Sequence, residues 1–161
     1  MIITGKRILI LTAAIAAVAI IGACAKQNTQ LGFNASADGL ALEGYDTVAY
    51  FALGSAAKGD PRFKHVWNGV TWYFSSEENM KTFQAEPERY APQYGGYCSY
   101  AVSEGYTADG DPEAWKVVDG KLYLNYNMDV KATWEKKQSE RIENANKNWE
   151  SFKTKPPVKK G

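Results

Sequence analysis

Apolar positions divide the chain into one nearly continuous N-terminal run and a longer region with mixed periodicities. Residues 8–21 are apolar apart from Thr12, and Lys6 and Arg7 precede them. This run is shorter than the roughly 20 residues that a membrane-spanning helix needs. A basic start followed by a short apolar run is typical of an export signal. We therefore expect residues 1–23 to be a signal peptide.

The end of the apolar run favours a lipid anchor. Residues 21–24 read Ile-Gly-Ala-Cys, which resembles the lipobox of bacterial lipoproteins, where the cysteine is lipidated and becomes the first residue. This resemblance implies lipidation of Cys24 and attachment to a bacterial envelope membrane. Residues 23–25 also fit an ordinary signal peptidase site, in which two small residues separated by one position precede the cleaved bond. Both alternatives export the protein, and an uncleaved anchor would need a longer apolar run.

Composition sets the limits of the folded region. Residues 24–38 are small and polar without periodicity, which is typical of a flexible tether. Residues 153–161 form a basic, proline-containing tail that we expect to be disordered. Residues 39–152 remain as one folded domain, a length that suits a single hydrophobic core.

Alternating apolar residues predict a first hairpin. Residues 62–67 and 70–74 flank Asn68-Gly69, a pair favoured in two-residue turns with positive φ angles. The register predicts the pairs Trp67–Val70, His65–Trp72 and Phe63–Phe74 on one apolar face. Because His65 lies within that face, we interpret it as a histidine at the edge of the core rather than as a metal ligand.

Capping signals predict the short helices around this hairpin. Asp46 is a favourable N-cap for a helical turn over residues 47–51. Ser75 and Glu78 fit a capping box that begins a helix ending near residue 85. Pro87 suits the first position of a further turn.

A second hairpin and a long helix complete the predicted fold. Asp119-Gly120 separates strands 115–118 and 121–124, and an apolar stripe predicts a helix over residues 129–152. The expected fold class is α+β: one small domain with two β-hairpins, short helices after the first hairpin, and a long C-terminal helix.

Composition and charge exclude several functions. The chain has 161 residues, of which 45% are hydrophobic and 13% aromatic. Without the predicted signal peptide, the chain has 17 basic and 18 acidic side chains. It therefore lacks the excess of positive charge that is typical of nucleic-acid-binding proteins. Cys98 is then the single thiol of the domain, which excludes an intramolecular disulfide framework.

The candidate site is the loop that carries Cys98. Residues 90–106 hold five of the ten tyrosines, and a glycine pair precedes the cysteine. Exported proteins rarely keep an unpaired thiol without a role, although free cysteine is also a common small core residue. A helical turn over residues 99–103 would place the thiol at a helix N-terminus, which favours the thiolate. The predicted ligand-binding residues, in chain order, are Tyr94, Tyr97, Cys98 and Tyr100.

Five segments carry a resemblance to a known family. The segments GYDTVAYF, NGVTWYF, FQAEPERY, APQYGGYCSYAVSEGYTADGDPEAW and VVDGKLYLNYN resemble exported YHS domain proteins of a subfamily with a GGYC loop. Better-known YHS domains hold soft metals through cysteines, and Asp46 matches their opening aspartate. The positions that match their cysteines are occupied by Ala49, Ser75 and Asn79.

The residues and the resemblance together predict a binding or sensing module rather than a turnover enzyme. Cys98 is its centre, and a soft metal such as copper or a redox ligand is the expected class of cofactor. The alternatives are a thiol-dependent redox protein that acts through an intermolecular partner and a structural envelope lipoprotein.

Overall fold

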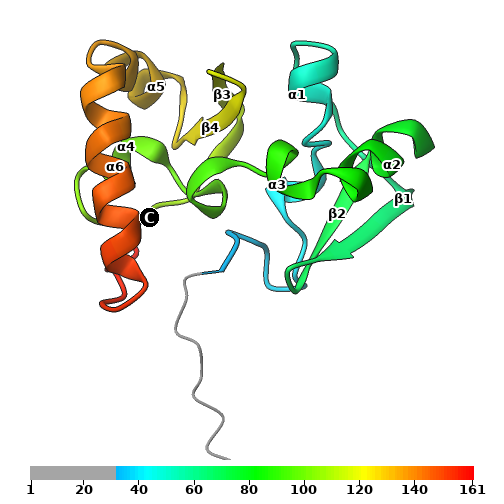
Figure 1. The fold of residues 1–161 in the computed structure, drawn as a ribbon, viewed down its shortest axis with the longest axis horizontal. Helices are drawn as coiled ribbons and strands as arrows, with labels where there is room; N and C mark the ends of the chain where they lie inside the picture. The colour runs from blue at the N-terminus through cyan, green and yellow to red at the C-terminus, as the bar shows by residue number, and fades with distance from the viewer. Residues whose placement is uncertain (1–31) are drawn as a thin grey trace, which may run out of the picture.

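The computed structural model describes residues 32–161; the predicted signal peptide and Cys24 lie outside these residues. Helices gather at two sides of a central hairpin (Figure 1), which confirms the predicted α+β class. The elements in chain order are η1 (Leu42–Gly44), α1 (Ala49–Ala52), β1 (Asp60–Trp67), β2 (Val70–Phe74), α2 (Glu77–Ala85), α3 (Pro87–Tyr90), η2 (Gln93–Gly96), α4 (Ser99–Ser103), β3 (Asp111–Val118), β4 (Lys121–Asn125), α5 (Met128–Glu135) and α6 (Gln138–Phe152).

The first hairpin, β1–β2, turns at Asn68-Gly69, where both residues have positive φ angles of 49° and 78°. Trp67 pairs with Val70 and His65 with Trp72, as predicted. The predicted pair of Phe63 with Phe74 is wrong. The register shifts within β1, so that Phe74 pairs with Asp60. Such an irregularity bends a strand and leaves little trace in its apolar alternation.

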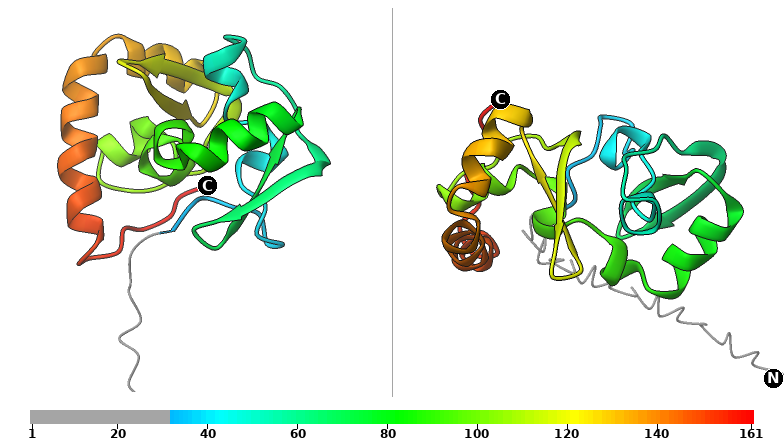
Figure 2. Two further views of the ribbon diagram at one scale, coloured as in Figure 1. Left: turned by 45° about the vertical axis from the view of Figure 1, so that its right-hand side comes forward. Right: turned by 90° about the horizontal axis from the view of Figure 1, so that it is seen from above.

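The second hairpin, β3–β4, turns at residues 119–120 and has the predicted register, with Trp115 opposite Leu124 and Val117 opposite Leu122. Its two faces belong to different clusters. Leu122 and Leu124 pack with Trp72 and other residues of the first hairpin, whereas Tyr123 packs in a second cluster with residues of α5 and α6. β4 is therefore buried on both faces, and Figure 2 shows the hairpin between the two groups of helices.

The predicted C-terminal helix is divided into α5 and α6. The break lies at Lys137, whose φ of −136° is not helical. Asn127 begins α5 by accepting a hydrogen bond from the Val130 amide at 2.8 Å. The change of direction lets Trp134 pack on Tyr123 at a ring distance of 5.6 Å while Ala145 of α6 enters the same cluster. The prediction of one continuous helix over residues 129–152 is therefore wrong, although its longer, C-terminal part is present as α6.

Both ends of the domain extend beyond the predicted boundaries. Phe33, assigned to the tether, packs against Trp67 and Trp72 at ring distances of 5.3 and 5.1 Å. The C-terminal tail runs back from α6 across the molecule (Figure 2) and pairs with Thr107, whose amide donates to the Val158 carbonyl at 3.0 Å. The expected disorder of the tail is wrong at this point, because a backbone ladder and an ion pair between Lys159 and Asp109 hold it.

In residues 32–161, every helix is too short or too polar to cross a membrane.

Replacement of Trp72 by alanine tests the packing of the first core. Trp72 is 1% exposed, and its indole lies against Phe33, Trp67 and Phe83. We expect Trp72→Ala to lower the free energy of unfolding by about 3–5 kcal/mol. Val66→Ala on the opposite, 64% exposed position should change it by less than about 0.5 kcal/mol. Equal effects of the two variants in urea titrations would contradict the assigned faces.

Candidate functional site

Cys98 lies between η2 and α4, where the chain passes beside the central hairpin. Its amide donates to the Ala108 carbonyl at 2.9 Å, and it forms an isolated parallel bridge with Leu124 of β4. Cys98 is also the N-cap of α4, with Sγ accepting from the Ala101 amide at 3.5 Å. The predicted helical turn after the cysteine is therefore confirmed.

Burial dominates the acid–base state of the thiol. Cys98 is 1% exposed, and burial raises the pKa of its thiol above the ordinary value. The backbone amides of Ala101, Tyr126 and Tyr100 act in the opposite direction, but their effect on the pKa is smaller. Because the thiolate is the reactive form of cysteine, Cys98 at neutral pH is a protonated sulfur and a weak nucleophile.

A pocket of about 260 Å³ opens above this sulfur. Most of its wall is aromatic or aliphatic, and one part is the C-terminal segment. Lys160 lies over the Tyr106 ring with Nζ 4.3 Å from the ring centre, and its amide donates to the Thr107 carbonyl at 2.7 Å. The residues that line the pocket are Cys98, Tyr100, Ala101, Tyr106, Ala108, Tyr126, Val130, Lys160 and Gly161.

Only one of the three predicted tyrosines shares this pocket with Cys98. Tyr100 lines it. Tyr94 instead donates its hydroxyl to Asn146 Oδ1 at 2.9 Å, and Tyr97 packs on Trp149 at a ring distance of 6.2 Å, so both belong to the α6 cluster. The structure does not bring all three to one pocket with Cys98, because Tyr94 and Tyr97, before the cysteine, pack in the α6 cluster, whereas Tyr100, after it, lines the pocket.

Tyr126 and Lys160 are pocket residues that the sequence did not reveal. Both come from segments far from Cys98 in the chain, and they reach it through the pairing of Cys98 with Leu124 and of Lys159 with Thr107. Neither pairing leaves a local signal, since each depends on how separate segments pack.

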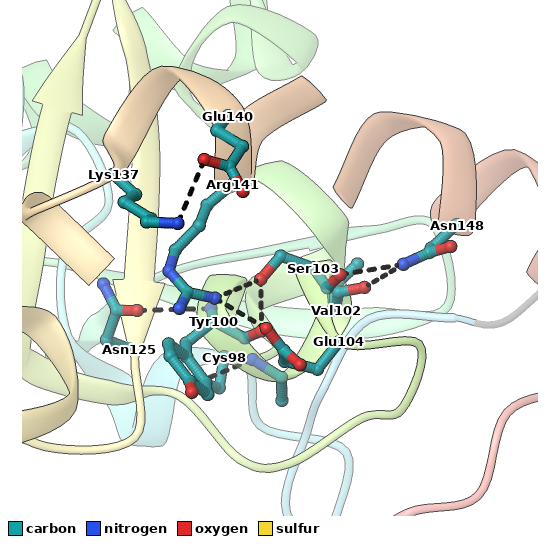
Figure 3. A network of polar contacts seen from close by, with 11 residues as sticks. Cys98, Tyr100, Val102, Ser103, Glu104, Asn125, Lys137, Glu140, Arg141 and Asn148 are labelled. Atoms are coloured by element: carbon teal, nitrogen blue, oxygen red, sulfur yellow. Dashed lines mark hydrogen bonds and ion pairs between the residues drawn. The ribbon is translucent and has the colours of Figure 1, made fainter. Parts of the chain in front are cut away.

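A polar network of residues from α4, β4 and α6 holds Tyr100 in place (Figure 3). The Arg141 guanidinium stacks over the Tyr100 ring, 4.0 Å from its centre, and donates to Ser103 Oγ and Glu104 Oε1 at 3.1 and 2.8 Å. Asn125 Oδ1 accepts from the Tyr100 amide at 3.3 Å. These contacts fix one wall of the pocket to α6 and β4.

A second constellation centres on Asp46, which is fully buried. One carboxylate oxygen accepts from the amides of Val48 and Ala49 at the start of α1, as expected for Asp46, although α1 begins at Ala49 with Val48 as its N-cap residue rather than at residue 47. The other accepts from the Ser75 amide at 2.8 Å, the Ser75 hydroxyl at 2.6 Å and Asn79 Nδ2 at 2.7 Å. Because Ser75 is engaged here, Ser76 caps α2 instead, and the predicted cap at Ser75 is wrong.

Metal donors do not gather in the described part of the chain. Within residues 32–161, no three side chains among His, Cys, Asp and Glu lie close enough together to hold a metal ion. His65 Nδ1 lies 3.3 Å from Gln84 Nε2, and its ring faces Phe83, at a centroid distance of 6.3 Å. These neighbours agree with its interpretation as a histidine at the edge of the core.

The comparison with family models matches residues 48–94 to the YHS domain. Searches of curated proteins and of solved structures each returned no match. The matched segment contains the first hairpin and the short helices around it, including Ser75 and Asn79, and it ends before Cys98. The resemblance to the YHS domain is thus shown for residues 48–94. The assignment to a subfamily with a GGYC loop stays a prediction.

The residues at the positions of the family's cysteines do not fit a soft metal. YHS domains are regarded as metal-binding domains, and soft metals select thiolate and thioether ligands. Here Asp46, Ser75 and Asn79 meet at this place. Their oxygen and amide groups are hard metal ligands rather than soft ones. Both carboxylate oxygens of Asp46 already accept hydrogen bonds from the protein.

Asp46→Asn tests whether hydrogen bonds take the place of a metal in this core. The amide would set an N–H₂ group against donors, so we expect a loss of at least about 2 kcal/mol in unfolding free energy. Asp129→Asn, at an exposed position in the first turn of α5, should cost less than about 1 kcal/mol. A chelator should leave the wild-type melting temperature unchanged, and a large decrease would contradict this interpretation.

Proposed function

We propose that this chain is an exported, lipid-anchored, YHS-like binding module whose ligand site is the pocket above Cys98. The observation that carries the proposal is that the buried Cys98 lines a pocket of about 260 Å³ together with three tyrosines. The family match supports the YHS part of the chain. Concave, mainly apolar pockets with a few polar groups are the usual form of small-ligand sites.

The chemistry of the wall favours a compact organic ligand. The lining combines three tyrosine rings, aliphatic groups and the protonated thiol, with Lys160 as its one cationic side chain. A cuprous ion would accept soft donors, but among the lining residues Cys98 is the single sulfur and no histidine accompanies it. The pocket therefore suits an apolar or aromatic molecule better than copper.

The redox alternative depends on a reactive thiolate. Its support is the place of Cys98 at the N-terminus of α4, and the raised pKa of the buried thiol argues against it. The structural alternative, an envelope lipoprotein without a ligand, predicts that Cys98 is inert to every reagent in the native state.

Labelling of Cys98 with iodoacetamide separates these alternatives. We expect native labelling to be slow at neutral pH and to rise with pH, with a midpoint above that of an ordinary cysteine, because burial raises the pKa of the Cys98 thiol. Native labelling should still exceed the rate set by global unfolding, since the pocket admits the reagent. Rapid labelling at neutral pH would support the redox function, and labelling limited by unfolding would support the structural one.

Removal of the sulfur tests ligand retention. Cys98→Ala should stay folded, with a loss of about 1–2 kcal/mol for the small cavity and the unpaired Ala101 amide. Native mass spectrometry of the wild type should detect a small bound molecule that the variant loses. Tyr106→Ala, within the pocket, should also lose it, whereas Tyr97→Ala, outside the pocket, should keep it. Retention by both Cys98→Ala and Tyr106→Ala would contradict the site.

The lipid anchor is tested independently of the pocket. Cys24→Ser should abolish labelling with radioactive palmitate and release the protein from membranes, because a lipidated cysteine carries the acyl chains that hold such a protein there. Intact-mass analysis that finds a wild-type chain beginning at Lys26 without acyl groups would instead support ordinary signal cleavage.

A further inference from the structure

A second cavity of the described region is separate from the pocket above Cys98. It has a volume of about 470 Å³ and shares no lining residue with that pocket. It lies where the two clusters meet, between the turn of the first hairpin, the segment from α3 to η2, and the last turns of α6. Boundaries between packed units are preferred places for ligands.

Four aromatic side chains form two walls of this cleft. Phe33 and Trp67 lie against each other at a ring distance of 5.3 Å, and Tyr94 and Trp149 do so at 5.9 Å. A backbone hydrogen bond from the Asn34 amide to the Gly95 carbonyl, 2.8 Å long, ties the two walls together at one end. The hydroxyl of Tyr94 is bound to α6, so its contribution to the cleft is mainly the ring.

The charge of the lining has one sign. Glu88, exposed on α3, is the single ionisable group among the lining residues apart from the Tyr94 phenol. Its neighbour Arg89 pairs with Glu86 at 3.3 Å, and within residues 32–161 no cation lies within 4.0 Å of the Glu88 carboxylate. The cleft thus combines aromatic faces with an unpaired carboxylate at its edge.

We propose that this cleft binds a small organic cation with methyl groups on its nitrogen, of the choline class. The negative faces of aromatic rings attract a cation, and methylated ammonium groups lose little hydration when they enter an aromatic-lined site. The negative Glu88 carboxylate also attracts a cation, whereas it would repel an anionic ligand. The proposal is independent of the pocket above Cys98, so either site can fail without the other.

Titration with choline, followed by calorimetry on the full-length protein, tests the proposal. We expect choline to bind at least about tenfold more tightly than 3,3-dimethyl-1-butanol, its neutral isostere, because the cation contributes beyond shape. Glu88→Gln should weaken choline binding roughly threefold to tenfold and reduce its dependence on salt. Glu78→Gln, an exposed change on α2 outside the cleft, should leave the affinity within about twofold.

Trp149→Leu tests the aromatic wall, with Glu88→Gln as the variant that leaves every ring in place. Trp149→Leu should weaken choline binding at least about fivefold, provided that its melting curve shows a folded protein. Three results would overturn the proposal: equal affinity for choline and its neutral isostere, choline binding unchanged in Glu88→Gln, or binding of N-acetylglucosamine in the absence of choline binding. The last result would identify a neutral sugar site.

Discussion

The burial of β4 on both faces is the constraint on which the rest of the structure depends. A two-stranded hairpin is marginally stable alone, and this one is stabilised because Leu122 and Leu124 enter the first cluster while Tyr123 enters the second. The loops that cross it must come very close. A Cβ on Gly110 would lie 2.8 Å from Leu124 Cβ, so glycine is required where the chain passes β4. The Cys98 segment is placed by the same strand through its bridge to Leu124.

Local signals in the sequence predicted local structure well. Asn68-Gly69 and Asp119-Gly120 identified both hairpin turns, since few residues tolerate two consecutive positive φ angles. The apolar alternation then set most of each register. The shift near Asp60, the break at Lys137 and the second role of Asp46 depend on contacts between distant segments. Such contacts leave no periodic pattern, and these are the places where prediction failed.

The candidate site shows the same division. The thiol, its position before a helical turn, and the aromatic character of its surroundings were visible in the sequence. The partition of the tyrosines was not visible, because all three contact the α6 cluster but only Tyr100 also lines the pocket. The closeness of these residues along the chain was therefore misleading as a guide to a shared site. Tyr126 and Lys160 join the pocket only through tertiary pairing.

The path of the C-terminal segment has a practical consequence for experiments. Gly161 lines the pocket above Cys98, and Lys160 covers part of it. An affinity tag or fluorescent protein fused after Gly161 would emerge at the mouth of this pocket and obstruct it. The exposed loop at residues 53–55, which follows α1 and lies outside the lining of both cavities, is a better position for a reporter. Binding data from C-terminally tagged protein should be compared with data from such an internal fusion.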